Sequence, residues 1–501
     1  MSTAGPAHRV QSAVVEYGYP QGHLGHLSDE EEVAFKNFKI LCEEKGYYKP
    51  GEGGTHDDAT LLRFLRARRF AVADAFKQFQ DTEDWRKSNQ LDTLYETIDL
   101  DQYEETRRLY PQWTGRRDRR GIPVYVYEVK HLNAKTMSAY EKSAKETSSK
   151  ATTDGKTPAK LLRLFALYEN LIRFVMPLCT ALTDREHPRT PITQSNNIVD
   201  ISGVGLKQFW NLRGHMQDAS TLATAHYPET LDRIFIIGAP AFFPTVWGWI
   251  KKWFDPITTS KIFIISHSDM QKTLEAFIDP ANIPKKYGGQ LDFTFGDLPV
   301  FDPAIAKVIQ WEGENKDFPH GPMYWRNTQG ERVEGKLGEE TKEMSALAVG
   351  SVEGKQREDS ICTVTRTLGK DEDVDGLTNG HVTAGTMAAL LEKSKTATED
   401  PGAEAGVNVD ADGVARPTNV LVPTKSQLEA PTQPPTPAHE LQEGDLVPAS
   451  RPEPKHFVTA DEGTGELAKK VEAVELSEKS GNLGNGNGNV VVGVNGNATH
   501  A

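Results

Sequence analysis

The chain has 501 residues, enough for two or three domains, and a formal net charge of −14 at pH 7. The negative charge is concentrated in the last third, because residues 341–501 carry 14 Lys and Arg against 25 Asp and Glu. The first 340 residues are therefore close to neutral, and the acidic total says little about what the folded part binds. We expect no nucleic-acid partner.

The three cysteines, Cys42, Cys179 and Cys362, are far apart and have no neighbouring His or Cys. This spacing predicts neither a disulfide framework nor a metal site. The N-terminus lacks the basic and apolar regions of a signal peptide, and no run reaches the roughly 18 apolar residues of a membrane span. We therefore expect a cytoplasmic, monomeric protein with no cofactor or metal.

The N-terminal region changes from irregular to helical at Ser28. Ser28 and Glu31 form a capping box, which predicts a helix. Two aspartates at 57–58 open a second helix, and the apolar spacing over 72–85 predicts a third. We expect an irregular segment, 1–27, followed by an all-helical domain, 28–95.

Residues 96–311 alternate between apolar strand runs and helical patterns. Such alternation is typical of βαβ units, so we expect an α/β domain with a mostly parallel sheet covered by helices. The polar stretch 137–157 is expected to be a loop or a poorly ordered insertion. Strands are predicted near 123–129, 197–202, 233–238 and 261–266, and helices near 158–175, 206–226 and 299–311.

The last part of the chain is poor in residues that build a core. Of the 42 Trp, Tyr and Phe residues, only Phe457 lies beyond Glu340. Such a segment buries too little apolar surface to offset its ordering entropy. We therefore predict that residues 312–501 form a disordered acidic tail.

The stretch from Tyr227 to Ser266 contains an unusual aromatic segment between two isoleucine-rich strand runs. Apolar residues at 243, 246, 247, 250, 253 and 254 follow helical spacing, whereas Phe242 and Trp249 fall outside that face. This helix either packs on two sides or contacts something apolar.

Catalytic motifs are absent from the sequence. There is no GxxxxGK[ST] phosphate loop, no GxGxxG after a strand, no GxSxG and no HExxH. The fourteen histidines are scattered. The sequence thus favours binding of an apolar ligand, and we expect no enzyme.

A set of motifs in fixed order resembles the CRAL-TRIO lipid-binding family. They are DDATLLRFLRARRF, DTEDWRK, YPQW, DRRGIPVYV, NNIVDISG, YPETLDRIFIIGAP, DPITTSKIFIIS and NIPKKYGG. Within the family they are most similar to the fungal cytosolic phosphatidylinositol/phosphatidylcholine transfer proteins of the secretory pathway. The match covers about residues 20–295.

The resemblance implies a helical N-terminal domain and a lipid-binding domain whose sheet forms the floor of a hydrophobic cavity. Such a cavity is physically necessary, since two acyl chains exposed to water would cost on the order of 20 kcal/mol. The aromatic segment then corresponds to the family's gating helix, which contacts the membrane. Its expected residues are Phe242, Phe243, Trp247, Trp249, Ile250, Lys251, Lys252, Trp253 and Phe254.

The family's inositol-lipid headgroup residues match five positions in this sequence: Arg68, Arg69, Glu229, Thr258 and Lys261. Arg69 stands where lysine is common and keeps the charge. A second, structural interpretation stays open both for the arginines and for the pair of Glu229 and Lys261. The arginines suit a solvated helix face, and Glu229 with Lys261 suits a structural ion pair.

The family's choline-lipid site matches less completely. Tyr125, Tyr168 and Ser195 fit its aromatic and hydroxyl positions, whereas Asn197 replaces a threonine and Thr114 replaces a tyrosine. Tyrosines near a choline can contribute cation–π attraction. Inositol-lipid binding is thus the firmer expectation and phosphatidylcholine the second candidate ligand.

Two functions follow from the resemblance. The first is a carrier that exchanges phosphatidylinositol at membranes, presents it to a phosphatidylinositol kinase, and supports phosphoinositide synthesis and secretory traffic at Golgi and endosomal membranes. The second is a sensor or scaffold that holds another hydrophobe (a sterol, a tocopherol-like molecule or haem) and recruits partners through its tail. Deleting residues 341–501 is expected to leave in vitro transfer intact.

Overall fold

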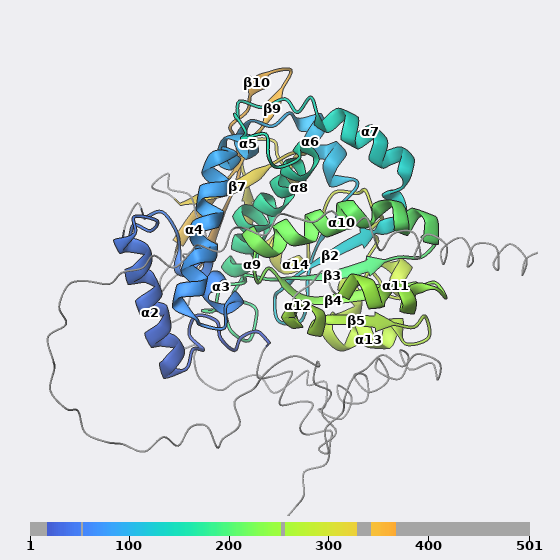
Figure 1. Ribbon diagram of the computed structural model, residues 1–501, viewed down its shortest axis with the longest axis horizontal. Coiled ribbons are helices and arrows are strands. Elements are labelled where there is room, and N and C mark those ends of the chain that lie inside the picture. Colours follow the sequence, from blue (N-terminus) through green and yellow to red (C-terminus); the bar gives the residue numbers. More distant parts are fainter. Residues whose placement is uncertain (1–17, 52–53, 252–255, 328–341, 367–501) are drawn as a thin grey trace, which may run out of the picture. The chain divides into compact units, whose positions relative to one another are not determined.

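The computed structural model describes residues 18–51, 54–251, 256–327 and 342–366 (Figure 1). All of them lie within one compact unit, Met1–Ala405. Most of the expected segment 1–27 and residues 367–501 of the expected tail lie outside the described residues.

The N-terminal part is helical, as predicted. Ser28 and Glu31 cap the first helix reciprocally, and the Asp57 carboxylate accepts a hydrogen bond of 2.6 Å from the backbone nitrogen of Thr60 at the start of the second. Apolar side chains of the first three helices, including Phe38 and Phe79, form one buried cluster. The helices are α2 (Asp29–Glu44), α3 (Asp58–Ala67), α4 (Val72–Ser88), α5 (Leu91–Thr97) and α6 (Leu100–Arg107).

A five-stranded sheet forms the centre of the second domain. Its strands lie in the order β1-β2-β3-β4-β5, with only β1 and β2 antiparallel. The predicted mostly parallel sheet is confirmed, although the sequence did not predict β1. The strands are β1 (Gln112–Arg117), β2 (Pro123–Glu128), β3 (Ser195–Asp200), β4 (Leu231–Ile237) and β5 (Ile262–Ile265).

The two faces of the sheet differ in how completely they are covered. One face, which includes Val126, Ile198 and Phe235, is buried against α13 (Met270–Phe277) and residues 278–293. The register Tyr127↔Val199↔Ile236↔Ile264 places four apolar side chains together on the other face. Tyr127, Val199 and Ile264 are only partly buried, so this face is a partly covered apolar floor.

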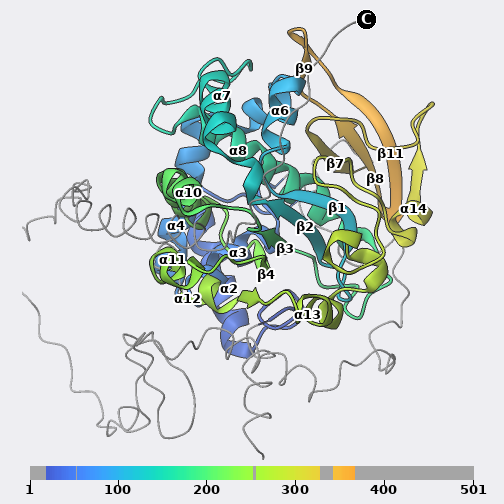
Figure 2. The same ribbon diagram turned by 90° about the vertical axis from the view of Figure 1, so that its right-hand side faces the viewer.

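Between the parallel strands, the predicted helices α8, α10 and α11 are present, whereas α12 was not predicted. Figure 2 shows α10, α11 and α12 on the same side of the sheet. The connection between β2 and β3 contains a continuous helical stretch, 159–181, with a π-helical turn in its middle. The elements are α8 (Ala159–Asn170), the π turn η2 (Leu171–Val175), α9 (Met176–Ala181), α10 (Leu206–His226), α11 (Phe243–Ile250) and α12 (Pro256–Ser260).

The stretch Ala159–Ala181 is long and apolar enough to span a membrane, which the sequence analysis did not recognise. However, 78% of its most apolar window is buried inside the protein. Arg163, Glu169 and Arg173 within it are fully buried and paired. Buried ion pairs are typical of a core helix, so we assign it to the protein interior.

One prediction about a polar segment is wrong, and one predicted helix is shorter than expected. The stretch 137–157, expected to be a loop or insertion, contains most of α7 (Ala134–Ala144). Asn133 caps this helix, and Met137 and Tyr140 are buried on one face of it. The helix expected over 299–311 is short, because α14 (Pro303–Val308) ends where strand β6 (Ile309–Trp311) begins.

The largest correction concerns the expected disordered tail, because residues 312–366 contribute most of a second sheet. The four-stranded antiparallel sheet has the order β6-β11-β8-β7, and the short strands β9 and β10 pair separately. The domain boundary at 311 is therefore wrong. The added strands are β7 (Met323–Asn327), β8 (Lys342–Ala348), β9 (Ser351–Val352), β10 (Lys355–Gln356) and β11 (Asp359–Arg366).

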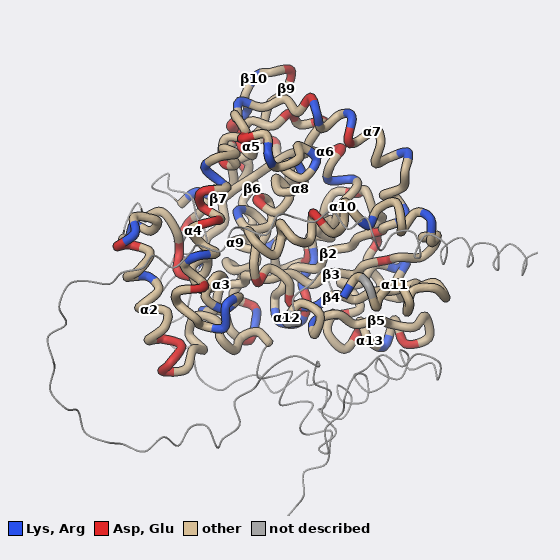
Figure 3. The backbone as a smooth tube through the Cα atoms, in the orientation of Figure 1, with Lys and Arg blue, Asp and Glu red and all other residues tan. Residues whose placement is uncertain are grey.

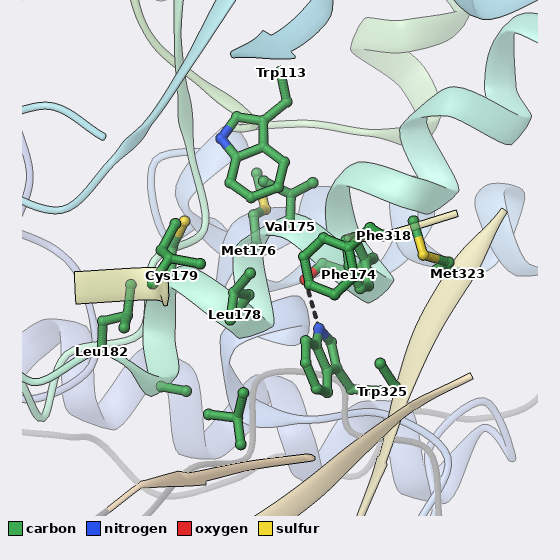
Figure 4. Close-up of a cluster of buried hydrophobic side chains, with 14 of the residues drawn as sticks. Trp113, Phe174, Val175, Met176, Leu178, Cys179, Leu182, Phe318, Met323 and Trp325 are labelled. Atoms are coloured by element: carbon green, nitrogen blue, oxygen red, sulfur yellow. Dashed lines mark hydrogen bonds between the residues drawn. The ribbon is translucent and has the colours of Figure 1, made fainter. Parts of the chain in front are cut away.

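This second sheet packs directly on the core helix (Figure 4). Trp325 is fully buried, stacks on Phe174 with centroids 5.5 Å apart, and donates its indole hydrogen to the Phe174 carbonyl at 2.9 Å. Cys179 and Leu178 of α9 belong to the same cluster. Residues up to Arg366 are thus part of the folded core.

Candidate headgroup site

Glu229 lies in the loop between α10 and β4, and its backbone has a φ of 56°. Residues other than glycine seldom adopt this left-handed conformation, so surrounding contacts must hold it. Tyr227 donates to the Glu169 carboxylate at 2.5 Å, and Arg63 donates to the Pro228 carbonyl at 3.3 Å. The backbone nitrogen of Ser195 on β3 donates to the Thr230 carbonyl at 2.9 Å.

Three donors converge on one oxygen of the Glu229 carboxylate. Oε2 lies 3.1 Å from Lys261 Nζ, 3.3 Å from Arg66 Nη2 and 3.5 Å from Gln194 Nε2. Lys261 also donates to the Leu231 carbonyl at 2.9 Å, which fixes the ammonium beside the start of β4. The expected proximity of Glu229 and Lys261 is therefore present in the structure.

Arg66, rather than Arg68 or Arg69, completes this ion cluster. Arg66 lies in the last turn of α3, four residues after the buried Leu62, so it projects from the buried side of the helix. The spacing of four residues from Leu62 could have identified Arg66 from the sequence. The headgroup role was predicted instead for Arg68 and Arg69, which follow the helix.

Arg68 and Arg69 lie at the surface, after the last residue of α3. Both are exposed, and Arg69 has a φ of 50°. Arg68 donates to the carbonyl of Ala67 at 3.3 Å. Within the part of the chain that the structure describes, neither makes a hydrogen bond or ion pair with Glu229.

Thr258 lies in α12 and is half-buried. Its carbonyl accepts a hydrogen bond of 3.1 Å from the Lys261 backbone nitrogen, so the two residues belong to one turn. Lys and Arg segments lie beside α3 and α12 in Figure 3. The cluster offers two cations for a phosphate and one carboxylate that accepts hydrogen bonds from hydroxyl groups.

The four residues expected at a choline-lipid site lie in different surroundings. Asn197 donates to the Ser195 hydroxyl at 3.1 Å, and Ser195 donates to the Thr230 carbonyl at 3.2 Å. Tyr168 is half-buried, with its ring centroid 4.9 Å from that of Tyr227. Burial raises the pKa of Tyr168 to about 12, so its phenol stays protonated at neutral pH.

Tyr125 is the only one of these four that lines a cavity of about 70 Å³ between β1, α6 and the segment before β7. Trp113, Phe174 and Phe318 contribute aromatic rings to its wall. Tyr125 is 9% exposed. Thr114 lies elsewhere, since its buried hydroxyl donates to the Val124 carbonyl at 2.9 Å.

A helix is present in the aromatic segment as α11, and its burial follows the predicted spacing. Phe243, Val246 and Ile250 are buried, whereas Phe242 and Trp247 are half-buried. Lys251 is half-buried after the helix. Lys252, Trp253 and Phe254 lie outside the described residues, and Trp249 is described only in its backbone.

The chain enters α11 through a turn that requires glycine. Gly238 follows β4 with a φ of 68°, and a Cβ atom there would lie 1.9 Å from the Ser202 hydroxyl oxygen. Any side chain at this position would clash. The start of the β4–α11 connection is therefore tightly specified.

Comparisons with known proteins identify the same region. The CRAL/TRIO domain family matches residues 107–289, and the CRAL/TRIO N-terminal domain family matches residues 34–81. The SEC14 cytosolic factor of Kluyveromyces lactis is 30% identical over 61% of this chain and 92% of its own length. The SEC14 cytosolic factor of Yarrowia lipolytica is 34% identical over 58% of this chain, and the match spans about half (55%) of that relative.

Two further matches extend the range of relatives. The phosphatidylinositol/phosphatidylcholine transfer protein SFH7 of Arabidopsis thaliana is 35% identical over 47% of this chain and 40% of its own length. The crystal structure of Sfh5 matches with a TM-score of 0.41 and 17% identity, over 55% of this chain and 92% of that structure.

Proposed function

Because this chain belongs to the CRAL-TRIO family, we propose that it binds phosphatidylinositol and exchanges it between membranes. The name of its relative SFH7, a phosphatidylinositol/phosphatidylcholine transfer protein, supports phospholipid binding and transfer as the general activity. The observation that carries the finer proposal is the cluster of Arg66, Lys261 and Glu229. A sterol or tocopherol has no phosphate for these cations to contact.

The inositol headgroup suits this cluster chemically. Its phosphate would accept charge-assisted hydrogen bonds from Arg66 and Lys261, which are stronger than neutral ones. Its ring hydroxyls would donate to the Glu229 carboxylate, one oxygen of which already accepts three donors. The acyl chains would cover the apolar floor formed by Tyr127, Val199 and Ile264.

Phosphatidylcholine is the second ligand that we propose. The aromatic cavity beside Tyr125 is suited to a quaternary ammonium group, since aromatic rings attract such cations. The Glu229 cluster and this cavity have different residues, so the two headgroups can be tested separately.

Lysine 261 provides the test of the inositol site. Lys261→Ala removes one of the two cations on Glu229 and should lower phosphatidylinositol transfer at least tenfold, with phosphatidylcholine transfer kept. The assay uses donor vesicles of phosphatidylcholine with a few mole per cent of labelled phosphatidylinositol. Lys272→Ala, a change in the same half of the sheet domain, is the matched control.

Lipids that co-purify with the full chain give the decisive measurement. Mass spectrometry should find phosphatidylinositol bound at a stoichiometric level. A sterol or haem without phospholipid would contradict the proposal, and unchanged transfer by Lys261→Ala would contradict the headgroup site. From the same premise, we propose that the protein delivers the lipid to a phosphatidylinositol kinase at Golgi or endosomal membranes. Lipid measurements in cells would test this delivery.

A further inference from the structure

His23 lies in the segment that precedes α2 and is almost fully buried, with 3% of its surface exposed. The ring packs edge-on against Tyr19, with centroids 5.1 Å apart. It also faces the buried side of α3, where Arg66 lies. A segment with no helix or strand of its own thus places one imidazole inside the protein.

Both ring nitrogens of His23 have defined partners. Nδ1 lies 3.0 Å from the Gln21 carbonyl, which can only accept, so Nδ1 carries the hydrogen. Nε2 lies 2.8 Å from Arg66 Nη1, which can only donate, so Nε2 accepts. The contacts therefore select one neutral tautomer of the imidazole.

Arg66 connects this imidazole to the headgroup cluster. Its Nη1 group donates to His23, and its Nη2 group lies 3.3 Å from Glu229 Oε2. A cavity of about 10 Å³, lined by His23, Arg63, Arg66 and Thr193, lies against the guanidinium. Without the imidazole this space would be larger, and the guanidinium could turn away from Glu229.

We propose that His23 is a positioning residue for the headgroup site: it accepts one hydrogen bond from Arg66 and thereby orients the guanidinium toward Glu229. This inference rests on the proposed function and adds the N-terminal segment to the binding site. His23 itself contacts neither Glu229 nor Lys261 in any hydrogen bond or ion pair of the described residues.

The charged groups around His23 favour its neutral form. Burial lowers the pKa of His23 well below its usual range, and the charges of Arg66 and Lys261 lower it further, opposed by Asp232. Arg63 on α3 lines the same small cavity, and Glu229 lies beyond Arg66. Protonation would place a fourth cation beside these groups and remove the acceptor from Arg66.

The test compares three single variants of the full chain. His23→Ala removes the acceptor and should lower phosphatidylinositol transfer about fivefold to tenfold. His23→Gln keeps an acceptor and a donor of similar reach and should restore transfer to within about twofold of the wild type. His26→Ala, in the same segment, is the matched control and should transfer normally.

Two further readouts separate positioning from general stability. Transfer of phosphatidylcholine by His23→Ala should change less than twofold, because that headgroup does not use Arg66. In the Glu229→Gln background, adding His23→Ala should cause no further loss, because the two residues act through one guanidinium.

Three outcomes would overturn the inference: normal phosphatidylinositol transfer by His23→Ala, equal losses in the Ala and Gln variants, or additive losses with Glu229→Gln. These outcomes differ from failure of the proposed function, in which the wild-type chain itself would not transfer phosphatidylinositol.

Discussion

Glu229 combines two unfavourable features. Its backbone has a positive φ although the residue is not glycine, and its carboxylate lies between two buried or half-buried cations. The side chains of Arg66 and Glu229 are about 10% exposed, so removal of one leaves the other poorly solvated. An unpaired buried charge is far more costly than an unmade surface contact. Arg66 should therefore contribute more to stability than the exposed Arg68 and Arg69 of the same motif.

Arg66→Ala should lower the free energy of unfolding by about 2–4 kcal/mol, because Glu229 and His23 both lose a donor. Arg68→Ala changes an exposed side chain and should cost less than about 0.5 kcal/mol. Denaturant unfolding of both variants measures the difference. Equal costs would show that the cluster does not have the strength we infer.

Two other histidines, the buried His215 and the half-buried His226, predict how stability depends on pH. Burial lowers the pKa of His215 and of His226 to about 4 each, from the usual value near 6.5. As the pH falls below about 6.5, the unfolded chain binds these protons while the folded protein does not. The stabilising contribution is therefore fully present above pH 6.5 and is lost as the pH falls toward 4.

His226→Gln should reduce the loss of stability between pH 7 and pH 5 by about 2 kcal/mol, since one such titration is removed. The exposed His267, changed to Gln, serves as the control and should leave the pH dependence unaltered. Urea unfolding at both pH values gives the comparison. An unchanged slope in His226→Gln would mean that the wild-type imidazole binds its proton equally in the folded and unfolded states.

At the scale of the elements, the C-terminal sheet limits how far the chain can be shortened. A chain of residues 1–340 lacks β8 and β11, the two central strands of that sheet, and would expose Trp325 and its neighbours. We therefore withdraw the expectation that deleting residues 341–501 is harmless. The last described strand, β11, ends at Arg366, so a truncation after this residue keeps every described strand.

Residues 1–366 should unfold at the same denaturant midpoint as the full chain, whereas residues 1–340 should be insoluble or strongly destabilised. Trp325→Ala tests the same packing within the full chain and should cost about 3–5 kcal/mol. A truncation at 340 with a wild-type midpoint would show that the second sheet does not support the core.

The sequence predicted elements that carry strong local signals. The capping box at Ser28, the isoleucine-rich runs of β4 and β5, and the aromatic spacing of α11 each specify one local structure. The buried residues of β8 are instead Met344, Ala346, Leu347 and Ala348, and none of them is aromatic. Aromatic content was the criterion for a core, and β8 and β11 contain no aromatic residue.

The headgroup site was predicted in part for a similar reason. Glu229 and Lys261 belong to loops at the starts of adjacent parallel strands, so their motifs place them side by side. The choice among Arg66, Arg68 and Arg69 depends on where α3 ends, and helix ends are hard to predict to one residue. His23 and Gln194 carry no motif, because only the tertiary fold brings them to the cluster.

For the molecule as a whole, the helical N-terminal domain is not separate from the binding site. Arg86 of α4 and Arg173 both pair with the fully buried Glu169, which also accepts the hydroxyl hydrogen of Tyr227. Arg63 and Arg66 of α3 contact the next two residues of that loop. The N-terminal helices therefore hold the loop that carries Glu229, and they form part of one functional unit with the sheet.

The segment beyond Arg366 changes the charge of the whole chain. Residues 367–501 carry 10 Lys and Arg against 21 Asp and Glu, so they hold most of the net charge of −14. A tethered acidic segment repels anionic membranes, and salt screens that repulsion within a Debye length of about 10 Å at 0.1 M.

Residues 1–366 should consequently associate more strongly than the full chain with vesicles containing phosphatidylserine, by about threefold or more at 20 mM salt. The difference should shrink toward zero at 0.5 M salt and be absent on neutral phosphatidylcholine vesicles. Vesicle co-sedimentation measures all three conditions. A salt-independent difference would require a specific contact rather than charge, and weaker association of the shorter chain would mean that the segment itself contributes to membrane binding.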